Sequence, residues 1–352
     1  MERTSIQNMC IILLIMLGTT VTQASAEVFT VDSNGGGNFA SIQNAVDNAH
    51  SGDTVMVNPG VYRENVAVNK ELTILSNPAL SDNDTNRTYV IGAVSKNDVF
   101  DVSSNNVKID GFYIIGGRSG VEREEIGIDL EGVENCSLSN NAIVLNDVGI
   151  SLNGSKSNYL DSNVVSLGDK GITLIDSDGN ILSNNTVTTN SDGISLNNSL
   201  NNTLISNIAD ANTIGVYLGM SRGNIFTYNT IMRNLYGING EAAKSNFMVN
   251  NSLYLNSIGI NLIGSSENSI YENQFANFFD AVDDGKNIWN STSKGNFWQN
   301  YTGQDADGNG IGDTPYVINQ MTESIDYMPL MSTNKTENVS GDTSDNTGGN
   351  ST

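Results

Sequence analysis

Three consecutive segments of the chain align without a gap: GISLNGSKSNYLDSNVVSLGDK at 149–170, GITLIDSDGNILSNNTVTTNSD at 171–192 and GISLNNSLNNTLISNIADANTI at 193–214. Each segment is 22 residues long and begins with Gly-Ile, and a Gly-Ile or Gly-Val pair recurs at the same spacing from Gly127 to Gly259. Apolar and polar residues alternate after each glycine, which is the pattern of a strand with one buried face. The spacing predicts stacked copies of one unit in a single elongated domain.

Three apolar lanes keep the 22-residue period. The first holds Ile128 and Leu130, Ile150 and Leu152, Ile172 and Leu174, Ile194 and Leu196, and their later counterparts. The second runs through Leu138, Leu160, Leu182, Leu204, Phe226, Met248 and Ile270, and the third through Ile143, Val165, Val187, Ala209, Ile231, Leu253 and Phe275. Short strands separated by turns cannot bury these lanes alone, so the units must stack as coils about 4.8 Å apart. We expect an all-β fold, a right-handed parallel β-helix (solenoid) of 22-residue coils.

Asparagine forms two further columns with the same period. They are Asn141, Asn163, Asn185, Asn207, Asn229, Asn251 and Asn273, and Asn158, Asn180, Asn202, Asn224, Asn246 and Asn268. Asparagine tolerates the left-handed turn conformation, and its amide can bond to the amide one coil away. We interpret both columns as structural turn positions, because turn polar groups need hydrogen-bond partners.

The two ends of the chain differ from the repeats. Residues 1–26 resemble a signal peptide, with an apolar run from Met9 to Leu17 and a small-residue cleavage site before Glu27. That run is about half of the roughly 20 residues that a membrane-spanning helix needs. Residues 332–352 are polar apart from Val339, which predicts a disordered Ser/Thr/Asn/Gly tail. Between them we expect a β-helix with its N-terminal cap at 27–294 and a C-terminal cap at 295–331.

The formal net charge of −23 limits the partners of the chain. So acidic a surface repels nucleic acid, anionic lipid and, without bridging cations, polyuronates. We expect a secreted protein at an extracellular or cell-surface location, whose partners are extracellular polysaccharide or cell-wall components, with no direct membrane span in the mature chain. Sequons such as those at Asn153, Asn197, Asn201 and Asn250 make it a candidate glycoprotein.

The N-terminal part carries a family resemblance. Residues 36–46 predict a turn and a short amphipathic helix, followed by GDTVMVNPGVYRENV at 52–66. This pair resembles the N-terminal cap and first coil of the pectin-lyase-like superfamily, and the coils resemble the NosD-type carbohydrate-binding and sugar-hydrolysis (CASH) repeat. The ending, from GNFW at 295–298 to DADGNG at 305–310, resembles that of archaeal cell-surface members. The resemblance implies an N-terminal capping helix over an otherwise exposed sheet edge.

Enzymes of that superfamily use clustered Asp with Arg or Lys, often with calcium. The candidate here is a carboxylate column two residues before the repeat glycine, formed by Glu125, Asp147 and Asp169, beside an insertion at 116–124 that carries Arg118 and Arg123. The alternative, which we favour, is that these carboxylates are solvated turn charges paired with the arginines.

Soft metal ligands are scarce in the sequence. The only histidine, His50, is expected to be exposed near the end of the cap helix, and Cys136 is the only cysteine after residue 26. One histidine and one cysteine are too few for a copper or zinc site, so the copper association of the NosD name is not expected to apply.

An oxygen-rich loop near the C-terminus is the best-defined ligand motif. Asp305, Asp307, Asn309, the Ile311 carbonyl and Asp313 occupy the first, third, fifth, seventh and ninth positions of a calcium loop. Tyr316 stands where a bidentate Glu belongs, so we expect a weak structural calcium site that fixes the C-terminal cap. An Asp-Gly-rich turn without metal is the alternative.

Two functional classes remain from the sequence. The first is a secreted or cell-surface β-helix protein, structural or glycan-interacting, without an identifiable catalytic site. The alternative is a polysaccharide-active enzyme, a lyase, hydrolase or epimerase, acting on an extracellular glycan. An aromatic-lined groove with clustered acid and base favours the enzyme, whereas a face of Asn, Ser and Thr favours the surface protein.

Overall fold

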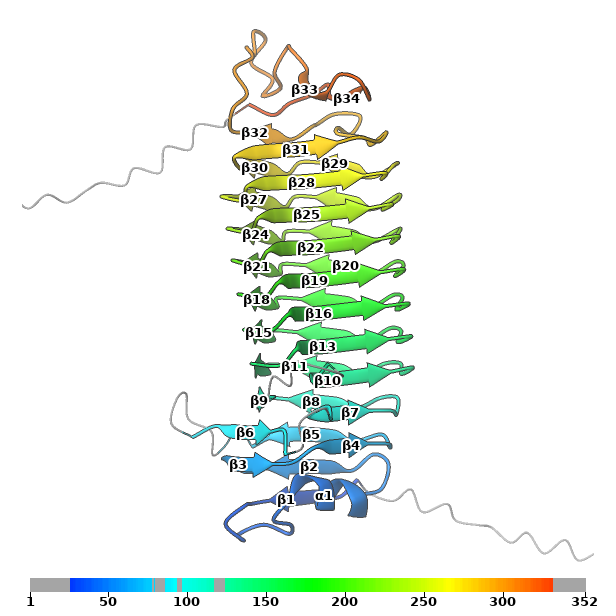
Figure 1. Cartoon of the computed structure of the whole chain (residues 1–352), viewed down its shortest axis with the longest axis vertical. Helices are drawn as coiled ribbons and strands as arrows, with labels where there is room; N and C mark the ends of the chain where they lie inside the picture. The colour runs from blue at the N-terminus through cyan, green and yellow to red at the C-terminus, as the bar shows by residue number, and fades with distance from the viewer. Residues whose placement is uncertain (1–25, 78, 80–85, 94–96, 117–123, 332–352) are drawn as a thin grey trace, which may run out of the picture.

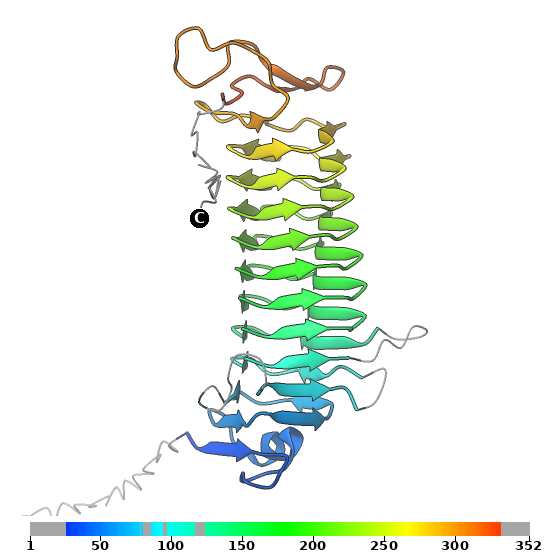
Figure 2. The same cartoon turned by 90° about the vertical axis from the view of Figure 1, so that its left-hand side faces the viewer.

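The computed structural model describes residues 26–77, 79, 86–93, 97–116 and 124–331. The described chain is an elongated stack of coils, with strands of successive coils side by side along one axis (Figures 1 and 2). Three parallel sheets, which we call A, B and C, run along the stack, and from β2 to β32 the strands that follow one another in the chain lie in different sheets. The predicted fold class, an all-β right-handed parallel β-helix with an N-terminal capping helix, is confirmed.

The strands of the three sheets have the following bounds. Sheet A contains β1 (Val28–Val31), β2 (Thr54–Val57), β5 (Thr73–Ser76), β8 (Lys108–Asp110), β11 (Ser137–Ser139), β14 (Tyr159–Asp161), β17 (Ile181–Ser183), β20 (Thr203–Ile205), β23 (Ile225–Thr227), β26 (Phe247–Val249) and β29 (Ser269–Tyr271). Sheet B contains β3 (Gly60–Arg63), β6 (Thr88–Ile91), β9 (Tyr113–Ile115), β12 (Ala142–Val144), β15 (Val164–Ser166), β18 (Thr186–Thr188), β21 (Ile208–Asp210), β24 (Thr230–Met232), β27 (Ser252–Tyr254), β30 (Gln274–Ala276) and β32 (Phe297–Trp298). Sheet C contains β4 (Val66–Val68), β7 (Phe100–Val102), β10 (Ile126–Glu131), β13 (Val148–Asn153), β16 (Lys170–Ile175), β19 (Asp192–Asn197), β22 (Ile214–Gly219), β25 (Tyr236–Glu241), β28 (Ile258–Ile263) and β31 (Phe279–Asp283).

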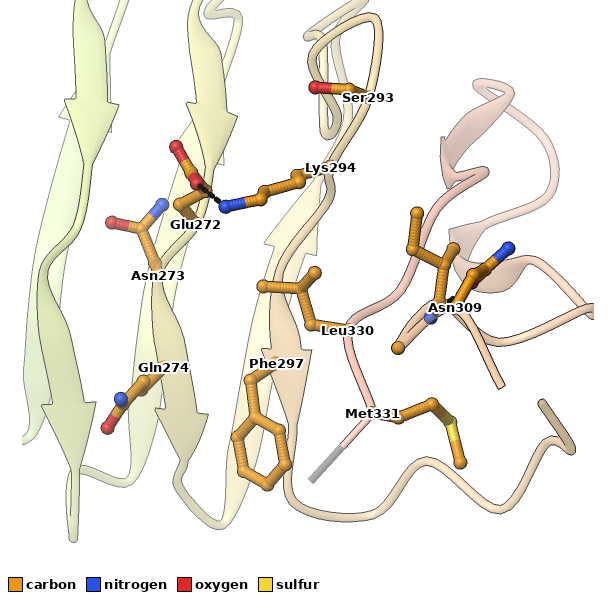
Figure 3. Close-up of a pocket in the computed structure, with 11 residues that line it drawn as sticks. Glu272, Asn273, Gln274, Ser293, Lys294, Phe297, Asn309, Leu330 and Met331 are labelled. Atoms are coloured by element: carbon orange, nitrogen blue, oxygen red, sulfur yellow. Dashed lines mark hydrogen bonds and ion pairs between the residues drawn. The ribbon is translucent and has the colours of Figure 1, made fainter. Parts of the chain in front are cut away.

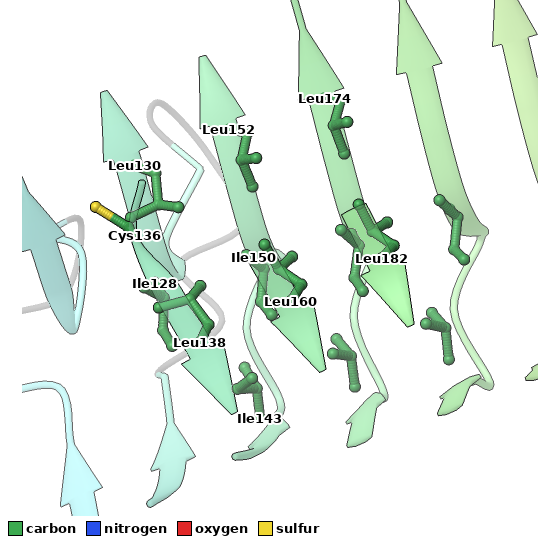
Figure 4. Packing of buried hydrophobic residues seen from close by; sticks show 14 of the residues in the cluster. Ile128, Leu130, Cys136, Leu138, Ile143, Ile150, Leu152, Leu160, Leu174 and Leu182 are labelled. Atoms are coloured by element: carbon green, nitrogen blue, oxygen red, sulfur yellow. The ribbon is translucent and has the colours of Figure 1, made fainter. Parts of the chain in front are cut away.

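The three apolar lanes form one continuous core. In sheet C, Ile150 pairs with Ile172 and Leu152 with Leu174, so each lane residue lies above its copy 22 residues earlier. All members of the three lanes are exposed by 2% or less. Figure 4 shows Leu138 and Leu160 of the second lane facing Ile128 and Ile150 of the first across the interior. The predicted register is confirmed.

The repeat glycine is required by the close approach of neighbouring coils. A Cβ added to Gly171 would lie 2.5 Å from the Gly193 carbonyl oxygen and 2.2 Å from a methyl carbon of Val187. The corresponding glycines from Gly127 to Gly259 meet the next coil at 2.4–2.7 Å in the same way. No side chain fits in this lane unless the coils separate.

Amide ladders hold the corners of the coils. The Asn185 backbone N–H and Nδ2 each donate to Oδ1 of Asn207 at 3.0 Å, and Nδ2 also donates to the Leu160 carbonyl at 2.9 Å. This arrangement repeats along both predicted asparagine columns, whose members are exposed by 3% or less. The structural interpretation of those columns is therefore supported by hydrogen bonds from one coil to the next.

Two further ladders were not predicted. One consists of Asn190, Asn212, Asn234 and Asn256, and the other of Ser155, Ser177, Ser199, Ser221 and Ser265, whose hydroxyls accept a backbone N–H from the preceding coil. Gly168 interrupts the first pattern in the sequence and Ala243 interrupts the second.

Each asparagine ladder ends at an aspartate. The ladder of Asn273 passes through Asn296 to Asp326 (N–H to Oδ2, 2.7 Å), and that of Asn268 passes through Asn287 to Asp283 (Nδ2 to Oδ1, 2.8 Å). The unpredicted asparagine ladder passes from Asn256 through Asn277 to Asp280, which accepts the N–H of Asn277 at 2.8 Å. The ladders donate toward the C-terminus, so the last coil needs acceptors, and a carboxylate offers only acceptors. Burial raises the pKa of Asp326 and of Asp280, while these hydrogen bonds oppose the rise.

Separate caps cover the two ends of the stack. Helix α1 (Ile42–Asn48) is capped by Ser41 and lies over the first coil (Figure 1). Glu64 of that coil accepts the backbone N–H groups of Ile42 and Gln43 at 2.9 and 2.8 Å. At the other end the hairpin of β33 (Tyr316–Asn319) and β34 (Ser324–Asp326) lies over the last coils. There Trp298 stacks between Phe275 (4.5 Å) and Tyr316 (4.2 Å), which extends the third lane into the cap.

We predict that Asn207→Ala destabilises the protein by about 2 kcal/mol or more, because it leaves buried donors and acceptors of three coils without partners. The control is Asn197→Ala, an exposed asparagine of the same coil, which should change the free energy of unfolding by less than about 0.5 kcal/mol. Urea unfolding followed by circular dichroism measures both. Equal effects of the two substitutions would contradict the ladder account.

Candidate functional site

The outer face of sheet C carries a continuous polar column. It lies between the two buried positions of the first apolar lane, so period-two alternation turns its members outward. Its members in successive coils are Asp101, Asp129, Ser151, Thr173, Ser195, Tyr217, Asn239 and Asn261. Although they point outward, Ser151, Thr173, Ser195, Asn239 and Asn261 are only 6–8% exposed. Sheet A differs, because one of its outward columns exposes Tyr159, Ile181, Ile225 and Phe247 by 42–45%. The second outward column of sheet C also exposes Ile175 and Ile263, by 38% and 49%, so the polar character belongs to the column from Asp101 to Asn261 and not to the whole face.

An acidic group, formed by Asp98, Asp101, Asp129 and Glu131, lies at the N-terminal end of this column. Asp129 is cross-strand neighbour to Asp101, and Asp98 accepts the backbone N–H of Ile126 at 3.3 Å. Burial raises the pKa of Asp129 to about 6, the negative charges of the other three members add to the rise, and a hydrogen bond with Ser151 opposes it. Asp98 and Asp101 also line a pocket of about 290 Å³ with Asn65, Val66, Ala67 and Asn97.

The predicted carboxylate column is in register but not uniform. Asp147 Oδ2 accepts the Glu125 backbone N–H at 3.1 Å, and the Asp147 carbonyl accepts the Asp169 N–H at 3.0 Å. Glu125 is fully buried and Asp147 is 7% exposed, whereas Asp169 is exposed. The interpretation of all three as solvated turn charges is wrong for Glu125 and Asp147. Arg118 and Arg123 lie outside the described residues.

Sequence reasoning missed the acidic group and Tyr217. The signal was present, because each member of the polar column stands between the two apolar residues of its strand and must point outward. Asp129 stands out there, since later coils carry Ser, Thr, Tyr or Asn at the same position. The proximity of Asp129 to Asp98, however, could not be predicted from the repeat, because the irregular insertion at 116–124 separates them in the sequence.

The calcium-like loop is closed by its own hydrogen bonds. Asp305 accepts the backbone N–H groups of Asn309 and Gly310 at 3.0 and 2.9 Å, and Asp313 accepts that of Ala306 at 2.9 Å. The bond from Gly310 is the main reason why the pKa of Asp305 lies below its usual value. Across the described parts of the chain, no three Asp, Glu, His or Cys side chains converge as metal ligands. Calcium binding by Asp305, Asp307, Asn309, Ile311 and Asp313 therefore remains a proposal.

A second pocket, of about 690 Å³, lies between this loop and the last coils (Figure 3). Lys294 and Glu272 form an ion pair at 2.8 Å on its coil side, and Asn309 and Ile311 contribute from the loop. Phe297 and Leu330 supply apolar surface, and Phe297 belongs to β32 of sheet B. This pocket therefore opens away from the polar column of sheet C.

The stacked 22-residue coils and the three parallel sheets define a right-handed parallel β-helix. The family described as "Periplasmic copper-binding protein (NosD)" matches residues 46–207 and 104–303, and the chain belongs to this family. His50 is exposed beside Asp53 after α1, whereas Cys136 is buried directly before β11, three strands further along sheet A. These two side chains do not converge, so the described residues do not fit a copper site.

Known proteins with similar sequence or fold have surface or glycan-related names. A "Cell surface glycoprotein" of Methanothermus fervidus is 35% identical over 135 residues, which is 38% of this chain and 20% of that protein. The chain thus spans about one fifth of that relative. The structural alignment with a rhamnogalacturonan lyase (TM-score 0.51, 14% identity) covers 75% of this chain and 86% of the lyase chain. The alignment with the DFA-IIIase of Arthrobacter chlorophenolicus A6 in complex with DFA-III (TM-score 0.50, 16% identity) covers 69% of this chain and 78% of the DFA-IIIase chain. At these identities the two structures show the fold alone.

No helix in the described ranges is both long enough and apolar enough to cross a membrane. The predicted signal peptide falls within residues 1–25 except for its last position, and the predicted tail at 332–352 also lies outside the described residues. Both remain predictions from the sequence.

We predict that Asp129→Asn raises the melting temperature at pH 7.5 and changes it little at pH 4. The folded-state pKa of Asp129 lies above its unfolded value, so ionisation costs folding free energy; this cost grows as pH rises from the unfolded value of 3.8 to about 6 and is constant above that. Thermal unfolding of both proteins from pH 4 to pH 8 measures it. A melting temperature of the variant that tracks the parent at every pH would refute the pKa shift.

For the calcium proposal, we predict that millimolar calcium raises the melting temperature of the parent relative to chelator and that Asp305→Ala with Asp307→Ala removes the shift. Binding to the folded state alone stabilises it in proportion to ln(1 + [L]/Kd). An equal shift in the parent and the double variant would place calcium elsewhere.

Proposed function

We propose that this protein is a cell-surface β-helix of the NosD family that binds an extracellular polysaccharide along the outer face of sheet C. The observation that carries the proposal is the polar column from Asp101 to Asn261, which crosses eight successive strands without an apolar residue. Hydroxyl, amide and carboxylate groups in a row can exchange hydrogen bonds with the hydroxyls of a glycan laid along the stack. The name of the Methanothermus relative supports the surface location.

The dimensions of sheet C favour an extended ligand over a compact one. Its strands from β10 to β28 are six residues long, whereas the corresponding strands of sheets A and B have three. The repeat along the stack is about 4.8 Å, which is comparable to the length of one sugar residue. A linear glycan can therefore meet equivalent groups in successive coils. The pocket beside Asp98 lies at the N-terminal end of the polar column, where one end of the glycan can bind.

A second function, polysaccharide hydrolysis, is favoured by Asp129. Glycoside hydrolysis needs a carboxylic acid with a raised pKa and a second, ionised carboxylate. Asp129 has a pKa of about 6, and Asp101 is its direct neighbour in the preceding strand of sheet C. Neighbouring strands lie about 4.8 Å apart, close to the carboxyl separation of about 5–5.5 Å in retaining glycosidases. In this role Asp129 protonates the glycosidic oxygen as its bond to the anomeric carbon breaks, and the Asp101 carboxylate attacks that carbon to form a glycosyl ester. Asp129 then takes a proton from a water molecule, which hydrolyses the ester and restores both carboxyl groups.

We predict that residues 27–331 bind a soluble polysaccharide and that Ser195→Arg weakens binding by blocking the column. The control, Thr203→Arg, makes the same kind of change in the same coil on the outer face of sheet A and should leave binding unchanged. A panel of plant, bacterial and archaeal polysaccharides on a glycan array identifies the ligand, and calorimetry compares the variants.

Incubating the protein with each polysaccharide that it binds, and assaying the solution for new reducing ends, separates binding from hydrolysis. Binding without new reducing ends supports a binding protein, and new reducing ends that disappear in Asp129→Asn support the hydrolase. Equal weakening by Ser195→Arg and Thr203→Arg, or no binding by the parent across the panel, would overturn the proposal for sheet C.

A further inference from the structure

Tyr217 lies on the outer face of sheet C in an unusual position. A Cβ added to Gly219 would lie 2.9 Å from Tyr217 Cε1, 3.2 Å from Cζ and 3.0 Å from Oη. The ring is therefore folded down over Gly219, two residues further along β22, and lies along the strand. Its cross-strand neighbours, Ser195 and Asn239, are smaller. Gly219 leaves the space that the ring occupies.

Hydrogen bonds across the next two coils fix the ring in this position. Tyr217 Oη donates to Glu241 Oε2 at 3.0 Å, and Asn239 Nδ2 donates to Glu241 Oε1 at 3.4 Å. Asn261 Nδ2 in turn donates to Asn239 Oδ1 at 2.7 Å. Asn239 and Asn261 are cross-strand neighbours in the polar column. An aromatic ring and a chain of amide and carboxylate groups are thus ordered side by side before any ligand arrives.

We infer that the Tyr217 ring, with Glu241, Asn239 and Asn261, forms a platform on which one sugar ring of an uncharged glycan stacks. This inference rests on the proposed binding of polysaccharide along sheet C and names the site and the class of sugar. The apolar C–H face of a pyranose lies on the aromatic ring, and its hydroxyls bond to the neighbouring amides and carboxylate. A tyrosine with an apolar face and an anchored hydroxyl suits such a half-wet surface.

Charge selects against acidic sugars at this position. Glu241 bonds directly to the tyrosine hydroxyl, and Asp192 lies close enough for its charge to raise the pKa of Tyr217 further beyond the effect of burial. The nearest cation acting on Asp192 is Lys170, which forms an ion pair with Glu124 at 2.8 Å. A uronate or sulfated sugar on the platform would therefore face the carboxylates of Glu241 and Asp192. Neutral hexose or pentose residues avoid this repulsion.

The platform also accounts for a break in the polar column. In the four preceding coils the column consists of Asp129 and small hydroxyl residues, and in the two following coils it consists of asparagine. Tyr217 is its only aromatic member among the described strands of sheet C. A single ring flanked by hydrogen-bonding groups on both sides gives a linear glycan one stacking anchor and several polar contacts.

The test uses neutral and acidic oligosaccharides with four variants of residues 27–331: Ser195→Arg, Tyr217→Ala, Tyr217→Phe and Tyr159→Ala. Cellohexaose, xylohexaose and mannohexaose are the neutral probes, and oligogalacturonate of similar length is the acidic probe. We expect Tyr217→Ala to weaken binding of the neutral oligosaccharide that the parent binds by about tenfold or more, which is about 1.4 kcal/mol. Tyr217→Phe keeps the ring and should retain most of the affinity. Tyr159→Ala removes an exposed ring from sheet A and should have no effect.

The outcomes separate the platform from the broader proposal. If Ser195→Arg abolishes binding and Tyr217→Ala does not, sheet C binds glycan but Tyr217 only covers Gly219, and the platform inference fails. Tighter binding of oligogalacturonate than of every neutral probe overturns the choice of an uncharged ligand. If Ser195→Arg and Tyr217→Ala both leave a bound neutral glycan unaffected, or the parent binds no probe, both proposals fail. Thermal unfolding of each variant shows whether a lost affinity reflects lost folding.

Discussion

The stacking of like residues at the corners of the coils is the constraint on which the rest of the structure depends. Each ladder asparagine satisfies a backbone N–H in the preceding coil and donates to the next, as Asn185 and Asn207 do at 3.0 Å. A buried amide without its partner costs folding free energy, so a shift in the stacking register would be penalised at several corners at once. The glycine lane adds a steric requirement, because a Cβ on Gly171 would meet the next coil at 2.5 Å. Together they fix which residues stack from coil to coil, and the ladders persist in the last coils even where the spacing between ladder positions is 19, 21 or 23 residues.

The direction of the ladders decides how the stack can end. Asparagine side chains donate toward the C-terminus, so the final coil presents donors, and Asp326, Asp283 and Asp280 accept them. Trp298 donates its indole N–H to Asp326 and Trp289 donates to Asp283, both at 2.8 Å, which ties the aromatic cap to the ladders. The C-terminal cap is thus specified by hydrogen-bond direction as well as by the need to cover the last apolar lane.

These constraints act on the inward residues and leave the outward residues free to vary. Sheet C has the longest strands, so it offers the broadest surface on which varied side chains can be displayed. That freedom accounts for the coexistence of an acidic group at Asp129, a hydroxyl region at Thr173 and an aromatic position at Tyr217 within one column. The outer face is therefore the part of the coil that can differ from one coil to the next.

The sequence predicts what repeats and misses what occurs once. The lanes of Ile172 and Leu182 and the ladder of Asn185 were predictable because identical residues recur and must stack. The burial of Glu125 was not, since it depends on the adjoining irregular coils around Gly92, whose Cβ would lie 2.8 Å from Glu125 Oε1. The ring of Tyr217 could likewise be placed outward by alternation, but its position over Gly219 depends on a side-chain rotamer and a bond to Glu241.

Hydroxyl-radical footprinting of the mature protein, with and without saturating polysaccharide, tests most directly whether the outer face of sheet C is the functional surface. Our account predicts that oxidation of Tyr217 and Tyr236 falls on ligand binding, while oxidation of Tyr159 and Phe247, which are exposed on sheet A, stays the same. Protection of Tyr159 and Phe247 with Tyr217 unchanged would contradict it and place the glycan on sheet A.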